Sequence, residues 1–334
     1  MSSSRLDDID QLKGLLIILV LFGHITYIGT FSSEFQIVKE FVYIFHMPVF
    51  LIISGAFFKA IKNLEGFKKL LFSLVIPYFI FFTSYLVVLY FATSYGHFNT
   101  SNSIDSLRSI GYYLFIEPLA SYWYLHSLII FYLSFSLFPF ILSKVFSKKT
   151  SHFLSAIIIM SLIWYLQSVG VKVRPWVFFY FFVGYFFGRV LFDRNRRDGL
   201  FFVLSVVTIF FVSSEFTFYE IIDLPVFRLI FSICFLFIAL YIFRAMEFRF
   251  RFYFLSCLGR GSVVFFLLHV YPINLTKVIS GFFINLEPTG TIYLAFSLFF
   301  SFAFCFLFLV VSDYLTISRF LFGRSDMTKF ILLK

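Results

Sequence analysis

Long apolar runs recur along the whole chain and constrain its fold more than any other feature. About ten runs are about 17 to 25 residues long, the length that an α-helix needs to cross the roughly 30 Å hydrocarbon core of a bilayer. Backbone groups find no water there, so such segments fold as helices. The sequence predicts an all-α integral membrane protein, a polytopic bundle of about ten helices. We expect these spans at residues 14–33, 41–59, 70–94, 121–142, 152–169, 176–192, 199–214, 224–243, 262–283 and 291–315.

Composition supports this class and excludes others. The chain is 61% hydrophobic and 13% charged, far from the usage of soluble domains. Its net charge of +10 is spread over many short segments rather than along one basic stripe, so we expect no nucleic acid as a partner. Three cysteines lie at no motif spacing, and no metal site is expected. We treat residues 1–334 as a single transmembrane domain.

The basic residues indicate the orientation of the bundle. Most of the 27 lysines and arginines fall in six segments that share one side of the predicted topology, and positive loops stay cytoplasmic. The opposite side has Lys39, Arg108, Lys172 and Arg174, while Arg228 and Lys277 fall within or near span ends. We therefore expect both termini in the cytoplasm. The six basic segments are residues 5–13, 59–69, 144–149, 189–197, 244–260 and 319–334.

The first predicted span contains one histidine, His24, and it follows a charged segment, residues 5–13, which we call the charged collar. Lys13 and His24 are eleven residues apart, so on a helix they share a face to within roughly 20° and are separated by about 16 Å along the axis. Asp10 lies within roughly 40° of that face, but about 21 Å below His24. We expect Asp10 to orient Lys13 or another cation, because it cannot reach the imidazole.

A histidine within an apolar span is either functional or a hydrogen-bonded packing residue. His24 and His269 are predicted at similar depths and could face one cavity, whereas His46 lies nearer the outer end of its span. Pro48 and Pro272 interrupt apolar helices, and each frees a carbonyl that protein, water or ligand must satisfy. On its own, the pair Ser54-Gly55 indicates a place where two helices pack closely through small residues.

Several motifs, taken in order, resemble those of the acyltransferase-3 family. The strongest match is Asp10-x-x-Lys13-Gly14 with His24, followed by His46-Met-Pro48-x-Phe50-x-x-x-Ser54-Gly55 and a basic pair, Lys68-Lys69, before Pro77-Tyr78. The Lys-Gly form and the Phe-His-Met-Pro run look most like the fucose 4-O-acetylase-like branch. Much of the family has arginine where this chain has Lys13. Shorter matches to the family's motifs follow at Trp123-Tyr124-Leu125, Gly184-Tyr-Phe-Phe-Gly188-Arg189 and Gly259-Arg-Gly-Ser262-x-x-x-Phe-x-x-His269.

This resemblance implies a membrane O-acyltransferase that moves an acetyl group from acetyl-CoA to a hydroxyl of a cell-surface or lipid-linked glycan. It implies a multi-pass protein of the bacterial cytoplasmic (inner) membrane. We expect His24 to be the catalytic base, since a neutral imidazole with an unperturbed pKa near 6.5 accepts protons readily. Donor phosphates would rest on Lys13, Lys68, Lys69 and Arg260, with support from Asp10, His46, Ser54, Trp123 and His269.

Two other classes of protein compete with this interpretation. A transporter or flippase of lipid-linked sugars would also have broken helices and polar groups at depth, although no inverted repeat is evident. A glycan polymerase is expected to have a larger charged extracytoplasmic loop. The longest loop here, residues 95–120, contains in residues 104–114 a pattern typical of a short amphipathic helix that covers lipid or closes a cavity.

The charge bias predicts which loops face outward. A single cysteine placed at Ser101 should react with an impermeant thiol reagent in intact cells, whereas one at Ser147 should react only after the membrane is opened. The three native cysteines are replaced by serine in both variants. Labelling of the Ser147→Cys variant in intact cells would contradict the predicted orientation.

Overall fold

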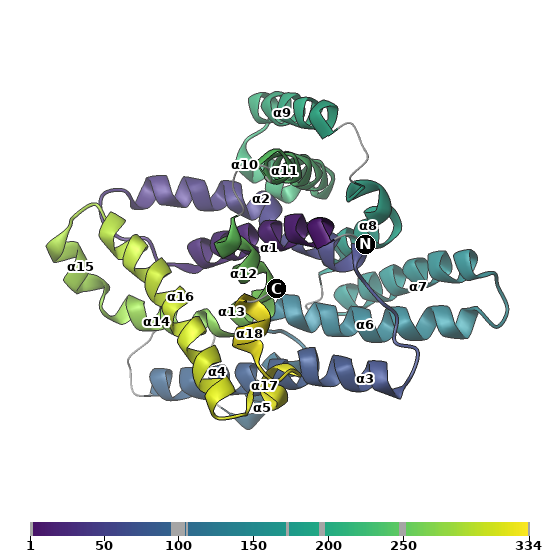
Figure 1. The fold of residues 1–334 in the computed structure, drawn as a ribbon, viewed down its shortest axis with the longest axis horizontal. Coiled ribbons are helices and arrows are strands. Elements are labelled where there is room, and N and C mark those ends of the chain that lie inside the picture. The colour runs from purple at the N-terminus through teal and green to yellow at the C-terminus, as the bar shows by residue number, and fades with distance from the viewer. Residues whose placement is uncertain are drawn as a thin grey trace.

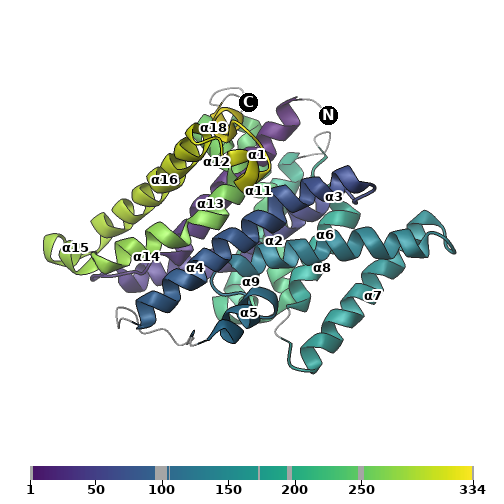
Figure 2. The same ribbon diagram turned by 90° about the horizontal axis from the view of Figure 1, so that it is seen from below.

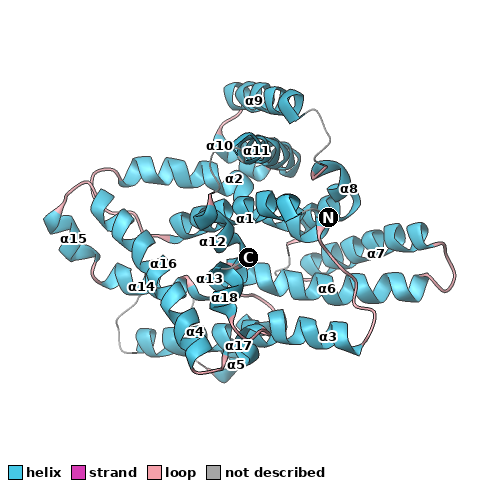
Figure 3. Cartoon of the chain, viewed as in Figure 1, coloured by secondary structure: helices cyan, strands magenta, loops and turns pink. Residues whose placement is uncertain are grey.

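The computed structural model describes residues 3–94, 104, 106–171, 174–193, 198–246 and 252–332, and within them it contains helices and loops and no strand (Figures 1 and 3). The chain folds as a polytopic helical membrane protein, as predicted. The helices are α1 (Ser3–His24), α2 (Ser32–Ala56), α3 (Leu64–Leu70), the π-helical turn η1 (Leu71–Val75), α4 (Ile76–Ser94), α5 (Leu107–Phe115), α6 (Tyr122–Leu142), α7 (Lys148–Ser168), α8 (Pro175–Leu191), α9 (Asp198–Glu215), α10 (Phe218–Asp223), α11 (Pro225–Met246), α12 (Tyr253–Arg260), α13 (Ser262–Leu268), α14 (Val270–Val278), α15 (Ser280–Leu286), α16 (Thr291–Tyr314), α17 (Ser318–Phe322) and α18 (Met327–Leu332).

Seven helical segments among the described residues are long and apolar enough to cross a membrane. They are α2, the continuous segment from α3 to α4, and α6, α7, α9, α11 and α16. The other three predicted spans correspond to α1, which has the charged collar, to α8, which is only 17 residues long, and to the broken segment from α13 to α15. The expected count of ten is therefore not confirmed.

Helix α1 runs through the middle of the bundle, with α9 and α11 on one side and α3 and α4 on the other (Figure 1). It packs against α12 with almost no space between the two backbones. A Cβ atom on Gly14 would lie 1.9 Å from the carbonyl oxygen of Leu255, and one on Gly259 would lie 1.8 Å from that of Asp10. Glycine at both positions therefore lets the two helices meet.

A second close contact joins α2 to α8 in the same way. A Cβ atom on Gly55 would lie 2.0 Å from the carbonyl oxygen of Phe181, and one on Gly184 would lie 2.0 Å from that of Ile52. Gly188 meets the side chain of Ala56 one turn further along. These glycines let the two helices pack closely, which is the role that the sequence suggested for the Ser54-Gly55 motif. The Ser54 side chain lies on another face of α2.

The first helix ends earlier than predicted. The span expected at 14–33 ends at His24, and residues 25–31 form a non-helical link to α2. Gly29 takes a left-handed conformation there (φ 81°), and the Thr30 N–H donates to the carbonyl of Pro288 at 2.9 Å. Hydrogen bonds to the α15–α16 loop thus replace the helical bonds that would have continued α1.

The span expected at 262–283 is also broken, into α13, α14 and α15, with the first break at His269. Pro272 has no N–H to offer to the carbonyl of residue 268, so the helix cannot continue regularly through this turn. Tyr122 donates its hydroxyl to the neighbouring carbonyl of Leu267 at 2.8 Å. The π-helical turn η1 precedes Pro77 for a related reason, since a proline ring collides with the carbonyl four residues earlier.

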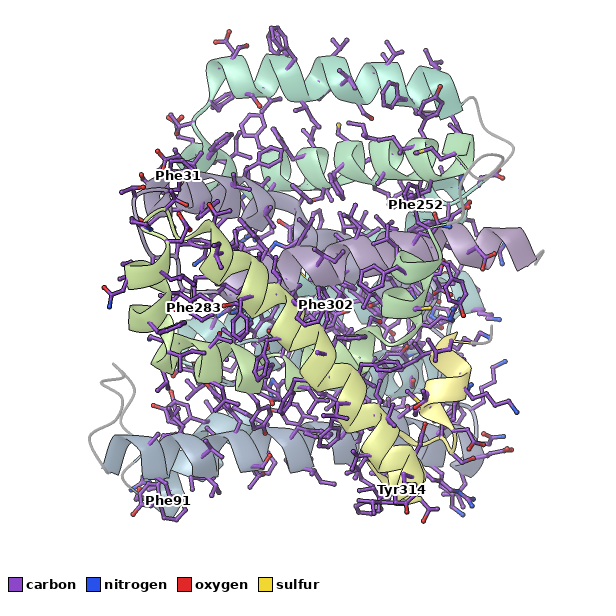
Figure 4. The ribbon with its side chains drawn as sticks, turned by 60° about the vertical axis from the view of Figure 1, so that its left-hand side comes forward. Phe31, Phe91, Phe252, Phe283, Phe302 and Tyr314 are labelled. Atoms are coloured by element: carbon purple, nitrogen blue, oxygen red, sulfur yellow. The ribbon has the colours of Figure 1, made fainter. Side chains whose placement is uncertain are left out.

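The short helix expected within residues 104–114 is confirmed as α5, which Ser106 begins with a capping box formed with Ser109. The first half of the 95–120 loop, apart from Ile104, lies outside the described residues. The start of α1 lies at the same edge of the molecule as α12 and α18 (Figure 2). Figure 4 shows Phe31, Phe91 and Phe283 at one end of the molecule and Phe252 and Tyr314 towards the other, with α16 crossing between them.

The contact between α1 and α12 predicts a specific stability effect. Gly14→Ala should destabilise the protein by about 1–3 kcal/mol, since the added methyl group has to push two backbones apart. Gly281→Ala in α15 is the matched control, because nothing lies within 4 Å of that position. Thermal unfolding in detergent should show a lower Tm for Gly14→Ala and an equal or higher Tm for Gly281→Ala. Equal Tm values for both variants would contradict the close packing of α1 on α12.

Candidate functional site

A cavity of about 540 Å³ opens where α2 ends and where α3 and α13 begin, beside the middle of α1. Three lysines, Lys13, Lys59 and Lys69, line it together with apolar and aromatic side chains. These cations come from α1, from the α2–α3 link and from α3, so the fold gathers charges that are far apart in the sequence. The remaining lining includes Phe50, Ile53, Ser54, Phe57, Ser73, Tyr124, Leu128, Tyr132, Ser262 and Phe266.

Lys13 is paired as the sequence predicted. Its ammonium nitrogen lies 2.7 Å from a carboxylate oxygen of Asp10, one turn earlier on α1, and both side chains are largely buried. Asp10 therefore orients Lys13, and it lies far from His24 on the same helix. The close approach of α12 at Gly14 fixes this turn of α1, so the ammonium reaches the cavity wall from a rigid element.

The other predicted donor-binding residues separate into two groups. Lys69 lines the cavity, whereas Lys68, one residue earlier on α3, is exposed and is not part of its wall. Arg260 is also outside the wall, because its Nε donates to the carbonyl of Ile331 at 2.8 Å and its guanidinium lies over the ring of Tyr253. Arg260 thus holds α18 against α12.

Three aromatic rings of the cavity wall lie together, and we call them the aromatic neck: Phe50, Tyr124 and Phe266. Their centroids are 4.8 Å apart for Tyr124 and Phe266, 6.0 Å for Phe50 and Tyr124, and 6.2 Å for Phe50 and Phe266. Ser54 shares a hydrogen bond of 2.9 Å with the Tyr124 hydroxyl. This bond fixes one ring of the neck, which gives Ser54 a defined place in the site.

Two histidines lie beyond the neck. The rings of His24 and His269 are 5.1 Å apart between centroids, and the ring of Phe266 contacts His269 at 5.8 Å. His24 comes from the end of α1 and His269 from the break between α13 and α14, so both imidazoles lie where a helix is interrupted. The two histidines, which were expected at similar depths, thus lie side by side, although neither lines the lysine-bearing cavity.

His269 has one defined tautomer and one unused nitrogen. Its Nδ1 lies 3.0 Å from the carbonyl oxygen of Phe265, and because a carbonyl only accepts, Nδ1 carries the proton. The Nε2 atom is fully buried and has no hydrogen-bond partner among the described residues. A buried nitrogen lone pair of this kind is costly unless a ligand or water satisfies it. The geometry therefore presents an acceptor beside His24.

Tyrosine hydroxyls hold the end of α1 in place. Tyr27 donates to the carbonyl of Phe22 at 2.8 Å, and Tyr43 of α2 donates to the carbonyl of Gly23 at 2.7 Å. Tyr43 is eleven residues from the start of α2 and thirteen from its end, so His24 lies near the midpoint of α2. Because α1 is continuous from Ser3, the separation of about 16 Å between Lys13 and His24 along its axis applies.

The two remaining predicted site residues, His46 and Trp123, lie outside the wall of the cavity. His46 is buried, its Nδ1 donates to the carbonyl of Val42 at 2.7 Å, and its ring contacts Tyr43 with centroids 4.9 Å apart. Trp123 is half-buried under the guanidinium of Arg174, which lies 4.7 Å from its ring centroid. Neither residue lines the lysine-bearing cavity.

Sequence reasoning missed several residues of the site. Tyr124 and Ser262 both stood inside quoted motifs, but no role was given to them. Phe266 also stood inside a quoted motif without a role. Lys59 was counted only as an inner charge, and Tyr43 looks like an ordinary member of a sequence with 20 tyrosines. No group of three or more metal-ligating side chains occurs among the residues searched, which are those that the structure describes.

The fold and the site together define a multi-pass membrane protein with a basic cavity on one side of an aromatic neck and paired imidazoles on the other. A family model described as an acyltransferase domain matches residues 6–310, nearly the whole chain. The chain therefore belongs to the acyltransferase-3 family and is a membrane acyltransferase. No curated protein and no solved structure matches it significantly.

Proposed function

We propose that this acyltransferase moves an acetyl group from acetyl-CoA to a hydroxyl of a cell-surface or lipid-linked glycan, in the manner of the fucose 4-O-acetylase-like branch. The observation that carries the proposal is the arrangement along α1: Lys13 faces a cavity with two further lysines, and His24 lies about 16 Å further along the same rigid helix. A coenzyme A donor has phosphates at one end and a thioester at the end of a long flexible arm.

The cavity fits such a donor in charge and shape. Lys13, Lys59 and Lys69 supply fixed positive charge for phosphates, with Lys13 the most rigidly held of the three. The arm would pass the aromatic neck, whose apolar rings exclude water from the thioester. Lys68 and Arg260, which were also predicted to bind the donor, would contribute through long-range attraction only.

His24 is proposed as the general base. It would accept the proton of the acceptor hydroxyl while that oxygen bonds to the thioester carbonyl carbon. The carbon–sulfur bond then breaks, and His24 returns the proton to the departing thiolate. Base catalysis of this kind contributes typically about 10²–10⁴-fold. His269 Nε2, the unpartnered acceptor beside His24, would accept from a different hydroxyl of the acceptor sugar, because the attacking hydroxyl has one proton and donates it to His24.

The orientation follows from charge. Positive-inside topology would put the lysine-bearing mouth in the cytoplasm, where coenzyme A is found, in the inner membrane of a bacterium. The acceptor would reach the histidines from the other end of the bundle, past the region where Trp123 and Arg174 lie. Donor and acceptor would thus enter by different routes and meet at His24.

The separation of Lys68 from Lys69 predicts a difference between two neighbouring lysines. Lys69→Gln should raise the apparent KM for acetyl-CoA several-fold and leave kcat nearly unchanged, because it removes a contact made equally before and during the reaction. Lys68→Gln is the matched control and should change the KM little, since its side chain is not part of the cavity wall. Steady-state kinetics with purified protein in detergent measures both. Equal effects of the two substitutions would place the phosphates outside this cavity.

The proposed base gives a second prediction. His24→Ala should lower kcat by about 10²–10⁴-fold while acetyl-CoA still binds, because the lost step is proton transfer. His24→Gln keeps hydrogen-bonding capacity but cannot accept a proton near neutral pH, so it should fail almost as badly. The readouts are acetyl transfer to a glycan acceptor and donor binding, each per amount of folded protein. If His24→Gln turned over near the wild-type rate, His24 would be a packing residue and His269 would be the next candidate base.

A further inference from the structure

Arg228 donates hydrogen bonds to two backbone carbonyls of α2. It lies in the first turn of α11, and it is partly buried. Its Nε donates to the carbonyl of Ile44 at 3.1 Å, and its Nη2 donates to the carbonyl of Tyr43 at 2.8 Å. No carboxylate among the described residues forms an ion pair with it. The charge is therefore directed at two backbone carbonyls.

Pro48 explains why one of those carbonyls is available. In a regular helix the carbonyl of Ile44 would accept from the N–H of residue 48, but proline has no N–H. Ile44 is fully buried, so water does not supply the missing donor. The Nε of Arg228 supplies it instead. The planar guanidinium also reaches the next carbonyl with a second N–H, which a lysine ammonium does not reproduce in the same geometry.

The turn that Arg228 holds is connected to the end of α1. Tyr43, whose carbonyl accepts from Arg228, donates its own hydroxyl to the carbonyl of Gly23, the residue before His24. The ring of Tyr43 also packs against His46. Arg228, Tyr43 and Gly23 thus form a continuous set of hydrogen bonds from α11 through α2 to the proposed base.

We infer that Arg228 is a positioning residue for acyl transfer, which acts by replacing the backbone donor that Pro48 removes and so fixes Tyr43 and, through it, His24. This inference rests on the proposed function. Arg228 does not line the cavity proposed for the donor, so its loss should lower kcat and leave the KM for acetyl-CoA unchanged. The inference also requires Arg228 and Pro48 to be energetically coupled, since the carbonyl of Ile44 is free to accept from Arg228 only because residue 48 is proline.

A double-mutant cycle between Arg228 and Pro48 tests this requirement. Arg228→Met keeps an apolar stem and removes both donors, and it should lower kcat by about 10²-fold, the size expected when a catalytic group is misplaced by about 1 Å. Pro48→Ala restores an N–H for the carbonyl of Ile44. In the Pro48→Ala background, Arg228→Met should therefore cost less than about 10-fold. Arg228→Lys should recover only part of the activity.

Two further variants separate positioning from general loss of structure. Tyr43→Phe keeps the ring and removes only the bond to Gly23, so it should also lower kcat at constant KM for acetyl-CoA. Arg319→Met, at an exposed arginine of α17, is the control and should leave both constants unchanged. The same cycle is measured on the Tm in detergent, where Arg228→Met should lower the Tm more in the wild-type background than in the Pro48→Ala background.

The possible results distinguish two kinds of failure. A wild-type protein that binds acetyl-CoA but transfers no acyl group would overturn the proposed function. An active wild type with an equally active Arg228→Met variant would overturn only the role of Arg228. An equal loss of kcat and of Tm in the wild-type and Pro48→Ala backgrounds would also overturn it, because the two residues would then be independent.

Discussion

Backbone groups that are freed inside an apolar bundle must find partners within the protein, and this constraint shapes the whole site. At the end of α1 and at Pro48 in α2, named side chains bond the carbonyls that are left free. Tyr27 and Tyr43 satisfy the carbonyls at the end of α1, and Arg228 satisfies the carbonyl freed by Pro48. His269 donates to the carbonyl of Phe265 at the break in the α13–α14 segment. The bonds that make these breaks tolerable are the same bonds that fix the position or the tautomer of the imidazoles.

The close contact of α1 with α12 gives this arrangement its rigidity. Gly14 and Gly259 let the two backbones meet, and the charged pair of Asp10 and Lys13 lies in the same turns. Lys13 and His24 are thus carried by one straight element that is held near its basic end by α12 and at its other end by Tyr43. A membrane acyltransferase has to bring a charged, water-soluble donor to a dry reaction centre. A single fixed helix that carries a cation at the mouth and an imidazole beyond an aromatic neck meets that requirement.

Much of this site could be predicted from the sequence, because helical geometry alone aligned Lys13 with His24 and kept Asp10 away from the imidazole. The limits have physical causes. The end of α1 at His24 has no local signal, since the residues that follow are as apolar as those before, and the bonds that replace the helix come from a loop more than 250 residues later. Phe50 and Phe266 stood inside the quoted motifs, but no pattern showed that their rings would meet the ring of Tyr124, because the three residues come from α2, α13 and α6. Which of the neighbouring residues Lys68 and Lys69 lines the cavity depends on how α3 is oriented, and the sequence does not give that orientation. The side chain that donates to the carbonyl freed by Pro48 lies on α11, 184 residues from Ile44.

The central claim is that one continuous route joins the lysine-bearing cavity to His24 through the aromatic neck, and a cryo-EM structure with coenzyme A bound tests it most directly. The account predicts phosphate density against Lys13, Lys59 and Lys69, with the arm between Phe50, Tyr124 and Phe266. The sulfur should lie about 3–3.5 Å from the ring of His24, the distance from which a reacting group is attacked or protonated. Density for the coenzyme outside this cavity, or an arm that ends short of the neck with the sulfur facing solvent, would contradict the account.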